Sequence, residues 1–239
     1  IIAIGSAGPD DIDRNRGVVN IYKYQDLGAF DMWSTIGRIE GENERDYSPS
    51  SIALSSNGKV LAIGASDNSA NGQSSGHVRI FRDVENSFEW QQIGTDIDGL
   101  AQYDRLGSSV AISNDGNIVA IGVTGSDTNA SGSGHVSIYR NENNSWQQIG
   151  DNIVGTETAD SLGTSVSLSD DGSIVAIGAK QTDGFSGDGQ GYVRIYKNES
   201  DSWNQIGDDI QGEASSDYFG SSVQLGANGS TVAIGAMAV

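Results

Sequence analysis

Four aspartates recur at one point of a repeated sequence pattern, where a carboxylate could act as an acid, a base or a metal ligand. Each stands three residues before a glycine, or before Pro49 in the first copy: Asp46, Asp104, Asp160 and Asp217. Catalysis needs one asymmetric site, so a group present in every copy points to architecture. We interpret the four carboxylates as acceptors of backbone N–H bonds in a repeated turn.

The two histidines share one repeat position and are the other side chains that could act as a base or bind a metal. Val18 and Tyr192 stand in the other copies where His77 and His135 stand in these two. A position that accepts valine and tyrosine is used for packing or lies on the surface, so we expect the histidines to be neither a catalytic base nor a metal-binding pair. The chain also has no cysteine and no phosphate loop with lysine. We predict no catalytic, cofactor-binding or metal-binding residues, and no enzymatic activity.

One tryptophan opens the last strand of each predicted repeat, and an exposed indole can stack on a sugar ring. The four are Trp33, Trp90, Trp146 and Trp203. Because they share one phase, we favour a structural role in which each indole packs against the next repeat. Sugar stacking stays as the alternative, and with it a lectin-like function.

Four N-x-[ST] sequons are candidate sites of N-glycosylation: Asn129, Asn143, Asn198 and Asn228. We expect Asn143 and Asn198 in equivalent exposed turns, just before the tryptophan strand. A chain rich in serine and asparagine yields sequons by chance, but they favour a secreted protein.

These residues are positioned by a repeat whose clearest marker is the triplet A-I-G. Its glycine recurs at spacings of 59, 58, 56 and 57 residues, at Gly5, Gly64, Gly122, Gly178 and Gly235. A fixed period of this length is the signature of a repeat architecture. We divide the single domain 1–239 into repeats 1–45, 46–103, 104–159, 160–216 and 217–239, the first and last of them partial.

Each full period predicts four β-strands. The first, of the S-S-V-x-L-S type, is expected at Ser51–Ser55, Ser108–Ser113, Thr164–Ser169 and Ser221–Gly226. An Asn-Gly or Asp-Gly pair then predicts a two-residue hairpin turn. The second strand, V-A-I-G-A, is expected to be buried on both faces. The third alternates with period 2 and is expected at Val18–Tyr22, His77–Phe81, His135–Tyr139 and Tyr192–Tyr196.

Four short antiparallel strands followed by a longer crossing to the next repeat form one blade of a β-propeller. We therefore predict an all-β fold, a propeller-type array of four-stranded antiparallel blades with about four repeats of roughly 57 residues. Seventeen strands are expected, one more than the sixteen of a closed four-blade ring. The array is therefore predicted to be an arc or part of a larger ring, with a β-solenoid as the alternative.

The recurring motifs D-Y-F-G-S-S-V, V-A-I-G-A, G-Y-V-R-I-Y and W-x-Q together resemble the FG-GAP repeats of integrin α-type propellers, in the variant that carries a tryptophan strand. The resemblance covers nearly the whole chain and is strongest in residues 217–236. Leucine replaces the phenylalanine in two of the other copies, Ser48-Pro49 stands in place of Phe-Gly in the remaining one, and no copy keeps the final proline of the GAP motif. The resemblance implies the propeller fold in a secreted or cell-surface protein.

The resemblance also raises the question of calcium, because integrin-type blades that bind it carry an aspartate-rich loop between the first two strands. The corresponding connections here are short, such as S-N-D-G-N, and cannot supply the six to eight oxygens that calcium takes. We therefore expect no cofactor. Gly8–Arg16, with three aspartates, stays as the alternative place for calcium, although Arg14 and Arg16 could neutralise those charges.

The composition is strongly acidic, with 32 Asp and Glu, 13 Lys and Arg, and a net charge of −19. Such a field repels nucleic acid phosphates and anionic lipids, so we expect neither nucleic acid binding nor membrane insertion.

We expect an extracellular or cell-surface structural and adhesion module that acts through protein or glycan contacts. A carbohydrate-binding, lectin-like propeller is the alternative, and a propeller hydrolase or lyase is a less favoured one. The predicted strand count leaves incomplete blades, and unpaired strand edges recruit further strands. The expected partners therefore include other domains of the same chain, or further copies in a larger or filamentous assembly.

Overall fold

A computed structural model describes residues 1–6, 15–26, 28, 31–44, 46–84, 87–181 and 189–237. These residues form twenty β-strands in five antiparallel sheets. No helix capable of crossing a membrane occurs in this part of the chain. The predicted all-β class is confirmed.

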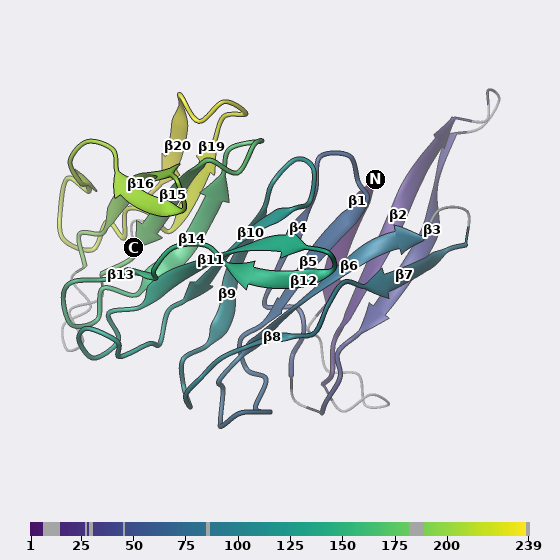
Figure 1. Cartoon of the computed structure of the whole chain (residues 1–239), viewed down its shortest axis with the longest axis horizontal. Helices are drawn as coiled ribbons and strands as arrows, with labels where there is room; N and C mark the ends of the chain where they lie inside the picture. Colours follow the sequence, from purple (N-terminus) through teal and green to yellow (C-terminus); the bar gives the residue numbers. More distant parts are fainter. Residues whose placement is uncertain are drawn as a thin grey trace.

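Each sheet takes its strands from one stretch of sequence, and the sheets follow one another along the long axis of the molecule (Figure 1). The first contains β1 (Ile2–Ser6), β2 (Val18–Asp26) and β3 (Asp31–Glu40). The second contains β4 (Ser51–Leu54), β5 (Val60–Ala65), β6 (His77–Val84), β7 (Glu89–Gln92) and β8 (Ile97–Asp98). The third contains β9 (Leu106–Ile112), β10 (Ile118–Val123), β11 (His135–Glu142), β12 (Ser145–Gln148) and β13 (Ile153–Val154). The fourth contains β14 (Leu162–Leu168), β15 (Ile174–Ala179), β16 (Tyr192–Glu199), β17 (Ser202–Gln205) and β18 (Ile210–Gln211), and the fifth contains β19 (Ser222–Leu225) and β20 (Val232–Gly235).

The predicted fourth strand is split in two in the second, third and fourth sheets, so the described residues form twenty strands and not seventeen. In the second sheet β7 ends at Gln92, and the chain passes through Gly94, whose φ of 73° suits glycine. The short strand β8 then pairs with the beginning of β6. In the first sheet this connection is one residue shorter, and β3 stays continuous through a bulge.

The predicted two-residue hairpin turn between the first and second strands is wrong. Ser55 N donates to Val60 O at 2.8 Å, so residues 56–59 form a four-residue connection. Gly58 alone among those four has a positive φ, of 70°, while Asn57 contributes through its side chain. The Oδ1 atom of Asn57 accepts the Lys59 N–H at 2.9 Å and the Ser55 hydroxyl at 2.8 Å. The Asn-Gly pair therefore marks an Asx-type turn.

Neighbouring sheets approach most closely at their first strands, β4, β9, β14 and β19. Ser51 Oγ of the second sheet donates to Gly107 O of the third at 2.7 Å, and the next two interfaces repeat this bond through Ser109 to Gly163 and Ser165 to Gly220. A Cβ atom at Gly64 would collide with the same Gly107 carbonyl. Close contact between sheets thus explains why this serine and the A-I-G glycine recur in each repeat.

Four hydrophobic clusters of described residues fill the spaces between successive sheets. Every residue of β5 is buried, as predicted for a strand packed on both faces. The cluster between the second and third sheets joins Ile80 of β6 to Leu106 and Val110 of β9. Burial of these side chains from water is the main force that holds one sheet to the next.

Candidate functional site

The four repeated aspartates each accept a backbone N–H bond before a first strand. In every copy Oδ2 accepts the N–H of the residue three positions earlier, at 2.8 Å. Asp160 is fully buried and also accepts a hydrogen bond from the Tyr192 hydroxyl at 2.9 Å. These oxygens are therefore engaged in the turns.

Two tryptophans bridge neighbouring sheets through their indole nitrogens. Trp146 Nε1 donates to Ile93 O, and Trp203 Nε1 donates to Ile149 O, each at 3.0 Å. Both indoles therefore pack on the preceding sheet, not on the following one as predicted from the sequence. Trp90 also packs against the preceding sheet, at Gly37 and Ile21, while Trp33 is 53% exposed.

The expected equivalence of the sequons Asn143 and Asn198 is wrong. Asn143 lies in the exposed turn between β11 and β12, with a φ of 55°, whereas Asn198 lies within β16 and matches Asn141 in register. Asn228 is exposed in the turn before β20, and the Nδ2 atom of Asn129 donates to Gly155 O at 3.0 Å.

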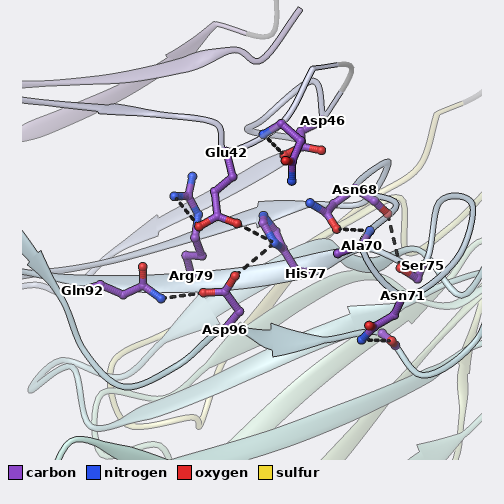
Figure 2. A network of polar contacts seen from close by, with 12 residues as sticks. Glu42, Asp46, Asn68, Ala70, Asn71, Ser75, His77, Arg79, Gln92 and Asp96 are labelled. Carbon is purple, nitrogen blue, oxygen red and sulfur yellow. Dashed lines mark hydrogen bonds and ion pairs between the residues drawn. The ribbon is translucent and has the colours of Figure 1, made fainter.

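A cluster of charged side chains surrounds His77 where the first sheet meets the second. His77 begins β6, Asp96 stands just before β8, and Glu42 belongs to the segment that follows β3. His77 Nδ1 lies 3.5 Å from Asp96 Oδ2 and 3.9 Å from Glu42 Oε2. Figure 2 shows the three side chains turned toward one another, with Arg79 on the opposite side of Glu42 from His77. We call Glu42, His77, Arg79 and Asp96 the second-sheet cluster.

Charge and burial act together in this cluster. Contact with His77 is the main cause that lowers the pKa of Asp96, partial burial opposes it, and the 2.6 Å hydrogen bond from Gln92 adds to the lowering. Burial, followed by the charge of Asp96, raises the pKa of Asp98. Arg79 Nη1 lies 3.5 Å from Glu42 Oε1, and its Nη2 donates to Glu40 O at 2.7 Å. Metal-ligand atoms of Glu42, His77 and Asp96 all lie within 4.8 Å of one another.

The equivalent place in the third sheet is hollow. His135 takes the position of His77, Ser137 that of Arg79 and Asn152 that of Asp96, while the counterpart of Glu42 is Leu100, which is 92% exposed. No guanidinium stands here, and a hollow of about 610 Å³ lies between the second and third sheets, lined also by Asp98, Asp104, Asp127, Tyr139 and Gln148. We call this space the third-sheet hollow.

Three polar side chains that line the third-sheet hollow are hydrogen-bonded to one another. Asn152 Oδ1 accepts hydrogen bonds from Gln148 Nε2 at 2.7 Å and from Ser137 Oγ at 3.0 Å. Burial lowers the pKa of His135, partly opposed by the charge of Asp104, and burial raises the pKa of Tyr139. At neutral pH the hollow therefore presents neutral polar groups together with nearby aspartates.

In the fourth sheet Tyr192, Arg194 and Asp209 fill the same three positions. Arg194 binds both carboxylate oxygens of Asp209 at 2.9 Å, and its Nη2 donates to Thr156 Oγ1, the counterpart of Glu42, at 3.4 Å. A second hollow of about 670 Å³ lies beside this pair, bordered by Tyr196, Trp203 and Gln205.

The repeat pattern in the sequence did not indicate that Glu42 and Asp96 lie beside His77. Glu42 and Asp96 lie 35 residues before and 19 residues after it. Pairing of β8 with β6 places Asp96 near His77, but only contact between the first and second sheets brings Glu42 to them. The sequence contained one signal for this cluster, because the acidic residue Asp96 stands two positions after the motif W-Q-Q-I-G. Residues 8–14 of the expected alternative calcium loop Gly8–Arg16 lie outside the described residues.

No family model matches the chain, and no curated protein matches it in sequence. Its fold is similar to that of a candidate 6-phosphogluconolactonase from Bacteroides uniformis, with a TM-score of 0.58 and 9% identity over 97% of this chain and 60% of that one. A protein from Lactobacillus plantarum is similar at a TM-score of 0.51 and 11% identity, over 83% and 50% of the two chains. Hydrazine synthase from Kuenenia stuttgartiensis is similar at 0.52 and 10%, over 93% and 65%.

This chain spans 50–65% of the length of those three structures. The similarity confirms the predicted β-propeller-type array of antiparallel blades. At such identities it shows the fold alone, because one fold supports many unrelated functions.

Proposed function

We propose that this chain is a glycan-binding propeller module of a secreted or cell-surface adhesion protein, and that the third-sheet hollow is its binding site. The observation that carries the proposal is the chemistry of that hollow. Its lining combines carboxylates, amides and two tyrosines, and its volume of about 610 Å³ falls in the range of small-ligand sites.

A neutral sugar has a suitable partner for each type of group in this lining. Sugar hydroxyls can donate to the carboxylates of Asp98 and Asp127 and can both donate to and accept from the amide of Gln148. The apolar face of a pyranose ring can pack on Leu100 and Tyr103, which border the hollow and are 92% and 48% exposed. A ligand held this way needs no charge of its own.

The chemistry of the hollow favours a neutral glycan over the phosphorylated substrate that the name of the Bacteroides uniformis protein indicates. Among the described residues that line it there are three aspartates and no lysine or arginine. Phosphate sites are usually built from guanidinium groups, lysines or helix N-termini, and three carboxylates repel phosphate. A lactone hydrolase acting on a phosphorylated sugar is therefore a poorer fit to this site.

The extracellular part of the proposal is supported by the sequons and by the resemblance to FG-GAP repeats. Asn143 and Asn228 both lie exposed in turns, where a glycan could be attached. Expression in a secretory host followed by mass spectrometry tests this part, with glycan mass expected on the peptides of these two asparagines. Unmodified asparagine at both positions would contradict it.

The binding site is tested by restoring the arginine that the other sheets carry. A glycan array identifies a ligand, and calorimetry then compares the wild-type chain with Ser137→Arg, which copies Arg79 and Arg194 into the hollow. We expect affinity to fall by about a hundredfold or more because the guanidinium occupies the space of the ligand. Trp33→Ala is the control, since Trp33 has an exposed indole on the first sheet, away from the hollow.

Three results would contradict the proposal. The array could show no bound glycan, the Ser137→Arg variant could bind as tightly as wild type, or Trp33→Ala could abolish binding. The last result would place the site on the exposed indole. Urea unfolding of both variants shows that any loss of binding is not a loss of fold.

A further inference from the structure

We propose that Glu42, His77 and Asp96 of the second-sheet cluster bind a divalent transition-metal ion of the zinc class. The ion would tie the first sheet, through the segment that carries Glu42, to the second sheet, which carries His77 and Asp96. The proposal is independent of glycan binding, because the third-sheet hollow lies on a different sheet interface.

The imidazole of His77 is the first observation that points to a ligand. His77 is 1% exposed, and within the described part of the chain neither ring nitrogen has a hydrogen-bond partner. Its Nδ1 atom nevertheless faces carboxylate oxygens of both Asp96 and Glu42 (Figure 2). A buried imidazole nitrogen that faces two carboxylates is stabilised by a cation between them, which is either a proton on Nδ1 or a metal ion, and the Zn²⁺ titration below distinguishes the two.

The distances between the donor atoms are close to those of a metal site. Two ligands bonded tetrahedrally at 2.0–2.1 Å from one ion lie about 3.3–3.4 Å apart. Nδ1 is 3.5 Å from the Asp96 oxygen and 3.9 Å from the Glu42 oxygen, and all three ligand atoms lie within 4.8 Å of one another. Glu42 is 40% exposed at its side chain, so it has room to move toward the other two ligands.

The donor set selects the class of metal. One imidazole nitrogen and two carboxylate oxygens suit zinc and its neighbours, whereas calcium takes six to eight oxygens. Water would complete the coordination on the solvent side of Glu42. The carboxylate oxygens that do not face His77 also have polar partners, because Gln92 donates to Asp96 Oδ1 at 2.6 Å and Arg79 Nη1 lies 3.5 Å from Glu42 Oε1. Such outer contacts orient metal ligands.

The third sheet provides a control with the same strand pairing. His135 begins β11 as His77 begins β6, but Leu100 and Asn152 stand where Glu42 and Asp96 stand. His135 Nδ1 is also buried without a partner in the described residues, yet it has no pair of facing carboxylates. We therefore expect zinc to bind at His77 and not at His135.

The test is a titration of chelator-treated protein with Zn²⁺ alone, followed by calorimetry and repeated with Co²⁺, whose visible spectrum reports the coordination. The variants Glu42→Leu and Asp96→Asn introduce the residues that the third sheet uses, so both are compatible with the fold. We expect one ion per chain in the wild type and affinity weakened by about tenfold or more in each variant. His135→Tyr, which copies Tyr192, should bind as the wild type does.

Two further readouts separate a site from loose association. Zn²⁺ should raise the melting temperature of the wild type and of His135→Tyr but not of Asp96→Asn, and Ca²⁺ at equal concentration should not compete. No Zn²⁺ binding, or binding that both Glu42→Leu and Asp96→Asn retain, would overturn the proposal. Equal loss of binding in His135→Tyr would overturn it as well.

Discussion

His77 and His135 begin equivalent strands of neighbouring sheets, yet charged side chains enclose the first and an open hollow borders the second. Three exchanges account for the difference: Glu42 to Leu100, Arg79 to Ser137, and Asp96 to Asn152. The backbone around both histidines is the same, since β6 and β11 pair with β5 and β10 in the same register. In this array the repeat supplies a fixed frame, and a few side chains at each interface determine what the position can bind.

Removal of the guanidinium from the second-sheet cluster should have the largest effect on stability. Arg79 is 6% exposed and donates to Glu40 O, so Arg79→Ser leaves that carbonyl and the nearby carboxylates without their cation. We expect a loss of about 2–4 kcal/mol in the free energy of unfolding, measured by urea titration.

Arg82→Ser on the same strand is the matched control. Arg82 is exposed and donates to Asn144 Oδ1 at 3.0 Å, so its removal should cost no more than about 1 kcal/mol. Equal losses in the two variants would show that the second-sheet cluster does not depend on its buried arginine.

The carboxylate of Asp96 should make the second sheet sensitive to acid. Its pKa is lower in the folded chain than in the unfolded one, so its contribution is complete above the unfolded value of about 3.9 and is lost as pH falls through the folded value. In metal-free buffer, Asp96→Asn should lower stability by about 1 kcal/mol at pH 7 and by less at pH 3.

The reciprocal change Asn152→Asp controls for the position itself. The third sheet offers Ser137 there and no arginine, so the new carboxylate should bring no comparable gain at pH 7. If Asn152→Asp raised the free energy of unfolding by as much as Asp96→Asn lowers it, the surroundings of the two positions would not differ.

Replacement of His135 should have the smallest effect on stability, and this effect should appear in a different range of pH. Burial lowers its folded pKa below the unfolded value of about 6.5, so the unfolded chain binds the proton more readily. Stability from this residue is therefore complete above about pH 6.5 and falls as pH drops through the folded value. His135→Tyr should lose less stability than wild type between pH 7.5 and 5.5, by less than about 1 kcal/mol.

Urea midpoints at the two pH values measure this difference, with metal absent. Asp104 faces His135 and opposes the shift, which keeps the expected effect small. Parallel curves for the wild type and His135→Tyr would contradict the assignment.

Local patterns in the sequence predicted the strands well. V-A-I-G-A marked strands that are buried on both faces in the second, third and fourth sheets, whereas the same prediction is wrong for β1 and β20 of the outer sheets, which are exposed or half-buried. The third strands were found at β2, β6, β11 and β16. These features follow from short-range periodicity and from burial.

The features that sequence reasoning missed depend on contacts or on small differences in register. The fourth strand splits where the chain passes through Gly94 and its counterparts, whose positive φ suits glycine, and the hairpin is longer because the Asn57 side chain accepts the hydrogen bonds of the turn. The second-sheet cluster could not be predicted from spacing, since Glu42 reaches His77 only when two sheets pack together.

The direct test of two different sites at one repeated position is an NMR measurement of the ring nitrogens of His77 and His135 during addition of Zn²⁺. The chain has two histidines, so His135→Tyr assigns both sets of signals. We predict that the nitrogens of His77 shift and saturate at one ion per chain, while those of His135 keep their positions. Equal shifts of the two rings, or no shift of either, would contradict the account.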